Sequence, residues 1–322
     1  MNINNMSIRT LSMLGQRGTF GQALLELASR DSRIVALSAD LCTTSGLDRF
    51  KAGYPGRFIN TGIAEQNLLG VAAGAADAGL VPFATTFANF ASLRACEMVR
   101  HYMSYMQCNV KLVGLAAGFA MELFGNTHYG VEDIAALRAM PNLLILSPAD
   151  GLETVKCVEA AAAVDGPVYL RLSGIMNAPI VYRADYSFTP GQAVILREGG
   201  DVALYATGSM VASALKAAEE LAKKECQAQV VNMHTIKPLD QAMLGLGVDC
   251  RLIVSIEEHS VVGGLGTAIA EALIEQGNTR KILKIGIPQK YFKAGSYEYM
   301  LYQAGLTVPQ IVSTVHDHFL RI

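Results

Sequence analysis

The sequence predicts an α/β protein of two domains, each built on a mostly parallel sheet covered by helices. Three observations support this prediction. The chain has 322 residues, which is about two domains of ordinary length. Short apolar runs alternate along it with alanine-rich helical patterns, as they do in parallel sheets covered on both faces. Hydrophobic residues make up 51% of the chain and charged residues only 17%, which excludes an intrinsically disordered protein.

The first half of the chain contains one such alternation. Its predicted strands are 33–37, 110–115, 143–146 and 167–170, and its predicted helices are 19–29, 64–78, 91–106 and 151–163. Thr19 is the expected N-cap of the first helix. We place the first domain at residues 1–176.

A second alternation follows an aperiodic, proline-containing segment. Residues 177–189 hold Pro179 and several aromatic residues without a clear period, and this predicts a linker. Beyond it, the predicted strands are 202–206, 229–233, 252–256 and 282–285, and the predicted helices are 210–224, 264–276 and a last one from about Pro309. The second domain is therefore expected at residues 190–322.

The composition argues against several classes of function. A net charge of −2 gives no electrostatic basis for nucleic-acid binding. The apolar stretch 78–93 is too short to span a membrane and contains Pro82, and we expect no secretory segment. The six cysteines form no CxxC pair, so we expect neither a disulfide framework nor a zinc site, but a protein of the reducing cytoplasm. The scarcity of charge predicts that a large subunit interface hides part of the surface.

Candidate functional residues cluster in three segments. Glu65 opens a predicted helix directly after a strand-like segment at 57–60. It either complements the helix dipole or belongs to a ligand site, because ligands bind at the carboxyl ends of strands in open α/β sheets. Phe87 and Phe90 are core residues or, if they line the same crevice, an aromatic slot for a flat heteroaromatic ring. His128 lies in a glycine-containing loop and is a ligand-binding residue or an ordinary loop histidine.

A glycine-rich segment, 263–266, opens another predicted helix after a strand. Its backbone N–H groups could hold an anion at the start of the helix. The glycines could equally serve to bring helix and strand close together.

Five segments, taken together and in order, resemble the transketolase family. They are Ser38-Ala-Asp-Leu41, the stretch 56–67, Thr86-Phe-Ala-Asn-Phe90, Gly125-Asn-Thr-His128, and Leu137–Leu143 followed by Ser147-Pro-Ala-Asp150. The later stretch 231–240 and Glu257-Glu-His259 resemble the C-terminal domain of the same family. Essentially the whole chain is similar to the C-terminal half of a transketolase, that is, its pyrimidine-binding domain plus its C-terminal domain.

The resemblance implies that thiamine diphosphate is the cofactor. In the family, the glutamate at the position of Glu65 donates a hydrogen bond to the pyrimidine ring nitrogen, so Glu65 would have to carry a proton. The resemblance further implies a set of contacts: the cofactor would be contacted by Asp40, Leu41, Ile63, Glu65, Phe87 and Phe90, and the substrate by Arg17, His128 and Arg171, with Glu65 and His128 catalytic.

Two departures from the family pattern affect the expected function. The family's Gly-Asp-Gly motif, which holds Mg²⁺ on the diphosphate, does not occur in the sequence. This predicts a split transketolase in which a second, N-terminal subunit supplies the diphosphate and Mg²⁺ site and the chain binds no metal itself. Homodimerisation would then give a dimer of heterodimers. In addition, Phe124 replaces an acidic residue and Ala116 replaces a histidine, both of which contact sugars in the family.

The expected activity is therefore transfer of a two-carbon ketol unit from a ketose, phosphorylated or otherwise modified, to an aldose. Two alternatives remain open. The first is the β subunit of a 2-oxo acid dehydrogenase, which shares the architecture, and the second is a regulatory subunit that has kept the fold without activity.

Overall fold

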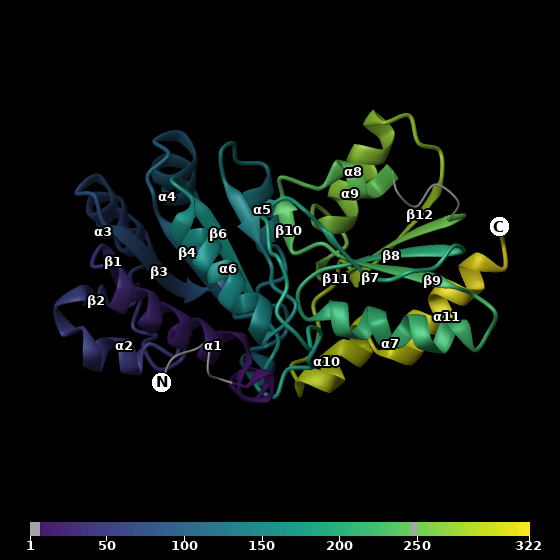
Figure 1. The fold of residues 1–322 in the computed structure, drawn as a ribbon, viewed down its shortest axis with the longest axis horizontal. Helices are drawn as coiled ribbons and strands as arrows, with labels where there is room; N and C mark the ends of the chain where they lie inside the picture. The colour runs from purple at the N-terminus through teal and green to yellow at the C-terminus, as the bar shows by residue number, and fades with distance from the viewer. Residues whose placement is uncertain (1–6, 246–249) are drawn as a thin grey trace.

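The computed structural model describes residues 7–245 and 250–322. It contains two sheets flanked by helices, and Figure 1 shows them side by side. Neighbouring strands are parallel except for one antiparallel pair in each sheet. The predicted α/β class with two mostly parallel sheets is therefore confirmed. The first six residues of the predicted first domain, and 246–249 of the second, lie outside the described residues.

The first sheet has seven strands in the order β10-β5-β6-β4-β3-β1-β2. They are β1 (Ile34–Ser38), β2 (Phe58–Asn60), β3 (Val81–Phe87), β4 (Lys111–Ala117), β5 (Leu144–Leu146), β6 (Val168–Ser173) and β10 (Thr235–Lys237). The strands β1, β3, β4 and β6 are buried along their whole length, because helices cover both faces of the sheet.

One face of this sheet is covered by α1, α2 and α6, and the other by α3, α5 and a continuous run of helical turns (Figure 1). The helices are α1 (Ile8–Arg30), α2 (Asp48–Gly53), α3 (Glu65–Asp77), α5 (Asp133–Arg138) and α6 (Gly151–Ala163). Two short 3₁₀ segments, η2 (Pro55–Arg57) and η5 (Glu122–Thr127), lie in loops.

The first helix begins earlier than predicted. Ser7 caps it by accepting a hydrogen bond from the backbone N–H of Thr10 at 3.1 Å. Thr19 is buried within the helix, and its hydroxyl donates to the carbonyl oxygen of Leu11. The prediction of Thr19 as N-cap is therefore wrong. The periodicity is interrupted at Gly15, where φ is +64°, a backbone conformation that favours glycine.

The predicted helix at 91–106 exists, but much of it is wider than an α-helix. It consists of the π-helical segments η3 (Phe90–Arg94) and η4 (Val99–Tyr105) on either side of α4 (Cys96–Met98). Such wide turns are frequent at functional sites, because the extra residue changes where side chains point. The first of them carries Phe90 at its start and Arg94 at its end.

The second sheet has five strands in the order β12-β11-β8-β9-β7. Its strands are β7 (Val194–Arg197), β8 (Val202–Ala206), β9 (Ala228–Asn232), β11 (Leu252–Ser260) and β12 (Lys281–Ile287). Its helices are α7 (Met210–Ala222), α8 (Gln241–Gly245), α9 (Leu265–Glu275), α10 (Tyr297–Ala304) and α11 (Val308–Phe319). The sequence predicted these elements within a few residues, except for β7, α8 and α10.

The two halves of the chain share the first sheet. Strand β10 belongs by sequence to the predicted second domain, yet it pairs antiparallel with β5. A buried carboxylate adds a further link, because Glu258 of β11 accepts a hydrogen bond from the backbone N–H of Phe119 at 2.6 Å. The domain boundaries stay a prediction. The structure adds that the first sheet takes its edge strand, β10, from the second half of the chain.

None of the helices in the described part of the chain has both the length and the apolar character needed to cross a membrane. All six cysteines are free thiols, and Cys157, Cys226 and Cys250 are buried.

The predicted linker is held against α6 by a buried glutamate. Glu153 is fully buried and accepts hydrogen bonds from the hydroxyl of Tyr186 at 2.5 Å and the amide of Asn232 at 2.8 Å. Burial raises the pKa of Glu153 to about 7, although these hydrogen bonds oppose the shift. Glu153 therefore keeps its proton in the folded protein at pH values where it would lose it in the unfolded chain.

We expect this glutamate to make the stability of the protein depend on pH. Because its pKa is raised on folding, its contribution is complete below the unfolded pKa and is lost as the pH rises through about 7. The variant Glu153→Gln mimics the neutral carboxyl and lacks this loss. From pH 5 to pH 8, the free energy of unfolding of Glu153→Gln should therefore rise relative to wild type by roughly 2–3 kcal/mol. Urea unfolding of both proteins at several pH values measures this difference, and a constant difference would contradict it.

Candidate functional site

The candidate residues lie at the carboxyl edge of the first sheet. Asp40 and Leu41 follow β1, Glu65 follows β2, and Phe87 is the last residue of β3. These three strands are parallel neighbours, so their carboxyl ends meet at one edge. The sequence segments that looked separate are thus neighbours in space.

Two turns at this edge are organised by Asn60, which was not among the predicted residues. Its side-chain oxygen accepts from the backbone N–H groups of Asp40 and Gly62, both at 3.0 Å. Its side-chain amide donates to the carboxylate of Asp40 at 3.0 Å. Asp40 has a positive φ of 59°, so these bonds stabilise a backbone conformation that is otherwise unfavourable for a residue with a side chain; Gly62 adopts its positive φ freely. The only indication of this role in the sequence was the position of the asparagine, at the end of a strand and directly before a Thr-Gly turn.

Glu65 is the first residue of α3, and its side chain is only 3% exposed. Its carboxylate oxygen Oε1 accepts a hydrogen bond from Nη1 of Arg94 at 2.9 Å. Arg94 lies at the end of η3 and was not among the predicted residues either. Its guanidinium also stacks on the ring of Phe90, 3.9 Å from the ring centre. Arg94 therefore connects the acid to the aromatic residues.

The predicted aromatic residues and the loop histidine form one cluster. The ring centres of Phe87 and Phe90 are 5.9 Å apart, and that of His128 lies 5.9 Å from Phe87 and 5.4 Å from Phe90. All three pairs pack edge to face, which is a favourable arrangement of aromatic rings. Glu65, Phe87, Phe90 and His128, predicted separately, are thus brought together.

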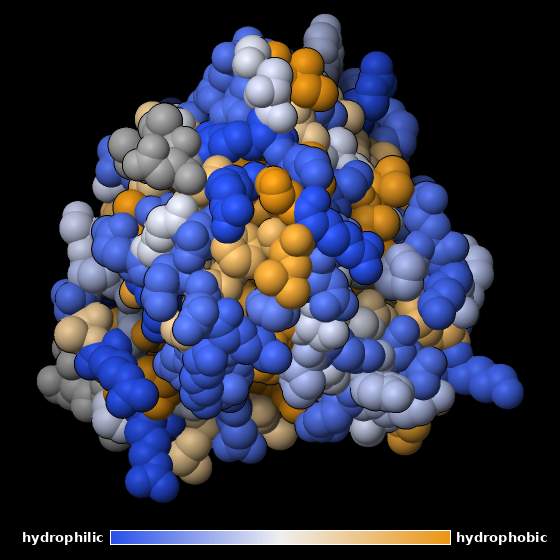
Figure 2. All heavy atoms as spheres, turned by 90° about the vertical axis from the view of Figure 1, so that its right-hand side faces the viewer, coloured by the Kyte–Doolittle hydropathy of each residue, from blue (hydrophilic) through white to orange (hydrophobic). Residues whose placement is uncertain are grey.

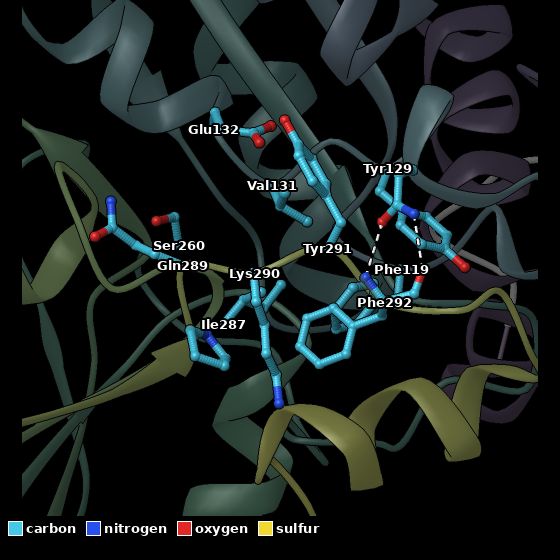
Figure 3. Close-up of a pocket in the computed structure, with 12 residues that line it drawn as sticks. Phe119, Tyr129, Val131, Glu132, Ser260, Ile287, Gln289, Lys290, Tyr291 and Phe292 are labelled. Atoms are coloured by element: carbon cyan, nitrogen blue, oxygen red, sulfur yellow. Dashed lines mark hydrogen bonds between the residues drawn. The ribbon is translucent and has the colours of Figure 1, made fainter.

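The loop that carries His128 is anchored on both sides. The side-chain amide of Asn89 donates to the carbonyl oxygen of Thr127 at 2.7 Å. Asn126 donates to the carbonyl oxygen of Phe292 at 2.7 Å and accepts from its N–H at 3.3 Å. Figure 3 shows Phe292, with these two hydrogen bonds as dashed lines, among the residues that line a cavity of about 300 Å³ between the loop and the segment after β12. The second domain therefore helps to fix the position of His128.

Of the two positions that depart from the family pattern, one borders this cluster. Phe124 is 65% exposed, and its ring centre lies 5.3 Å from that of His128. Ala116 is buried in β4. An apolar ring thus lies beside His128, whereas the Ala116 side chain is enclosed in the sheet.

Arg17 lies on α1, next to the loop after β1. A side chain at Gly46 of that loop would meet the carbonyl oxygen of Arg17 at 2.9 Å, so the two segments are in close contact. Partial burial lowers the pKa of the Arg17 guanidinium from its usual value. Within residues 7–245 and 250–322, Arg17 has no ion-pair partner. A half-buried cation of this kind suits an anionic ligand.

Two other predicted residues have different surroundings. Ile63 is 76% exposed at the rim. Arg171 is buried and binds protein groups: its Nε donates to the carboxylate of Asp133 at 2.8 Å, and its Nη2 to the carbonyl oxygen of Glu258 at 2.9 Å. The structure thus does not bring Arg171 into the cluster.

The N–H groups of the glycine-rich segment 263–266 are already occupied by a carboxyl group of the chain itself, Glu257, whose pKa burial raises to about 7. The carboxylate of Glu257 accepts hydrogen bonds from the N–H groups of Leu265 at 2.7 Å and Gly266 at 2.8 Å. A ligand anion at these N–H groups is therefore excluded. Gly264 also permits the close approach, since a side chain there would meet the Glu257 carboxylate at 2.1 Å.

Comparison with known proteins agrees with this arrangement. Residues 13–176 match the family model of the transketolase pyrimidine-binding domain, and residues 191–311 match that of the transketolase C-terminal domain. The chain is 42% identical to a 6-deoxy-6-sulfo-D-fructose transketolase subunit from Clostridium sp. (strain MSTE9), with 94% of this chain and 93% of that protein aligned. It is 37% identical to an apulose-4-phosphate transketolase subunit from Actinobacillus succinogenes, with 87% and 90% aligned.

Among solved structures, the chain is similar to one described as a split gene transketolase in the form of an inactive β4 tetramer. The TM-score is 0.87 and the identity 40%, and the match covers 95% of this chain and 98% of that one.

Proposed function

Because the chain belongs to the transketolase family, we propose that it is the β-type subunit of a two-chain transketolase that uses thiamine diphosphate. In this proposal it transfers a two-carbon ketol unit from a ketose to an aldose. The observation that carries the proposal is the cluster at the carboxyl edge of the first sheet, in which a buried acid, two aromatic rings and a histidine meet.

The residues of this cluster fit the pyrimidine half of the cofactor. Phe87 and Phe90 offer aromatic surface to a flat ring, and Glu65 offers a buried carboxyl to a ring nitrogen. Asp40, Leu41 and Ile63 border the same edge. When bound, the cofactor supplies the electron sink for carbon–carbon bond cleavage. The role of Glu65 is to hold a proton at that nitrogen, and the role of His128 is to bind a substrate hydroxyl.

A partner chain would complete the site from outside. Four large apolar side chains around the cluster are exposed: Ile63, Leu93, Leu123 and Phe124. In contrast, Figure 2 shows the end of the molecule formed by the second domain covered mostly by hydrophilic residues, with small apolar patches between them. We propose that an N-terminal transketolase subunit covers the exposed apolar residues and supplies the diphosphate and Mg²⁺ site, in a dimer of heterodimers. The relatives described as subunits and as a split gene transketolase support this arrangement.

The proposed substrates are sugars that carry an anionic group. Arg17 would bind that group, and the names of the two relatives refer to a sulfonated and a phosphorylated sugar. Phe124 and Ala116 remove polar contacts to sugar hydroxyls, which favours a modified sugar over an ordinary pentose phosphate. These residues thus support a substrate class without naming the sugar.

Replacing Arg17 by glutamine tests this role. We expect KM for an anionic ketose to rise about 10- to 100-fold with a smaller change in kcat, because a charge-assisted contact to a remote group contributes mainly to binding. Steady-state kinetics with the anionic sugar and its uncharged analogue measures the effect. An equal rise in KM for both sugars would contradict the assignment.

The proposed function is tested by reconstitution. The chain is mixed with a subunit that carries the diphosphate-binding domain, and the complex is assayed for ketol transfer and for decarboxylation with a lipoyl acceptor. We expect ketol transfer that depends on both chains and on thiamine diphosphate. Lipoyl-dependent decarboxylation would instead identify a 2-oxo acid dehydrogenase subunit, and the absence of both activities would favour a regulatory subunit.

A further inference from the structure

We propose that Arg94 is a positioning residue that closes the pyrimidine site in the cofactor-free chain and must release Glu65 when the cofactor binds. This inference rests on the proposed function. It starts from one feature: the guanidinium of Arg94 contacts the acid and one of the aromatic rings at the same time.

The charge of the contact is unfavourable for cofactor binding. A buried carboxylate needs a partner to remain ionised, and Arg94 provides it at 2.9 Å. An arginine bonded to a carboxylate favours the charged form, which can accept but not donate a hydrogen bond. A pyrimidine nitrogen with a free lone pair needs a donor. Glu65 Oε1 is therefore not available to the cofactor while it is bonded to Arg94.

The position of the contact is unfavourable as well. Arg94 lies 3.9 Å from the centre of the Phe90 ring and so covers one face of it. That face becomes available to another flat group only when the guanidinium moves.

Arg94 is able to move without disturbing the fold. Its side chain is 47% exposed, whereas that of Glu65 is 3% exposed. Its backbone is held separately, because its carbonyl oxygen accepts from the side-chain amide of Gln66 at 3.3 Å. The guanidinium can thus turn into solvent while η3 keeps its position.

Other titratable groups reach this part of the site only indirectly. His128 contacts Phe90 from the loop after β4, and Asp40 is bonded to Asn60 at the adjacent strand end. Within the described residues, Arg94 is the sole ion-pair partner of Glu65. Cofactor binding at Glu65 should therefore require one ion pair to open, the one with Arg94.

The experiment measures cofactor binding rather than turnover. Thiamine diphosphate is titrated in the presence of Mg²⁺ into the reconstituted two-chain complex by calorimetry. For Arg94→Met we expect a Kd about 5- to 10-fold lower than for wild type, because no ion pair has to open and no guanidinium covers the Phe90 ring.

Two further variants control for folding and for charge. Arg94→Lys keeps a cation and should stay close to wild type in Kd. Arg33→Met removes an exposed arginine, paired with Asp31 ahead of β1, and should match wild type in Kd. Thermal melts check that each variant folds.

An unchanged or higher Kd for a folded Arg94→Met complex would overturn the role of Arg94. A wild-type complex that binds no thiamine diphosphate would instead contradict the proposed function.

Discussion

Replacing Glu65 by glutamine in the reconstituted enzyme is expected to lower kcat by about 100-fold or more, which is the range for loss of a positioned proton-transfer group. Glutamine has nearly the same shape and can still accept a hydrogen bond from Arg94 through its side-chain oxygen, so the local structure should survive. What is lost is the proton that the carboxyl shares with the ring nitrogen. Ketol transfer at saturating cofactor measures the effect.

A nearby glutamate provides the matched control. Glu97 is exposed on α4, three positions beyond Arg94, and has no part in the cluster. Glu97→Gln should therefore keep wild-type turnover. If Glu65→Gln retains full turnover at saturating cofactor, the assignment of Glu65 as the catalytic acid is wrong.

Replacing Arg171 by methionine is expected to destabilise the fold by about 3–5 kcal/mol. Both Arg171 and its partner Asp133 are buried, at 1% and 0% side-chain exposure. Removal of the cation leaves the buried carboxylate of Asp133 without a charged partner. Tyr169 supplies only a hydroxyl donor, and burial lowers the pKa of His259, whose Nε2 lies 3.9 Å from Asp133, to about 4. Equilibrium unfolding of the isolated chain in urea measures the loss.

Two comparisons separate this structural role from substrate binding. The double variant Arg171→Met with Asp133→Asn leaves no buried charge and should recover part of the lost stability. Arg30→Met removes an arginine whose ion pair with Glu159 is exposed and should cost less than about 1 kcal/mol. If Arg171→Met instead keeps its stability and raises KM for the anionic sugar, the contact with substrate suggested by the family resemblance applies.

Much of the architecture could be predicted from local sequence. Fully buried parallel strands have to be continuous apolar runs, so β8 and β11 were recognisable without their neighbours. Glu65 and Phe87 could be placed because a strand end followed by a helix start puts both at one sheet edge. The order of apolar and polar residues over short stretches was thus enough to predict these strands and the placement of Glu65 and Phe87.

Other features depend on contacts between distant segments. The early start of α1 could not be predicted, because a kink at Gly15 interrupts the apolar periodicity of this helix. Nothing in the residues around Arg94 indicated that it pairs with an acid 29 positions earlier in the chain. The partners of Arg171 are Asp133 at the start of α5 and Glu258 on β11, and these two elements approach one another only in the folded protein.

Strand β10 has a consequence for how the polypeptide can be divided. Cutting the chain between the two halves would remove β10 and leave β5 as an exposed edge strand with unsatisfied backbone N–H and C=O groups. The N-terminal fragment would then tend to pair this strand with another strand, for example one from a second copy of itself. A break near residue 190 would therefore not yield two self-sufficient proteins, even though the sequence changes character there.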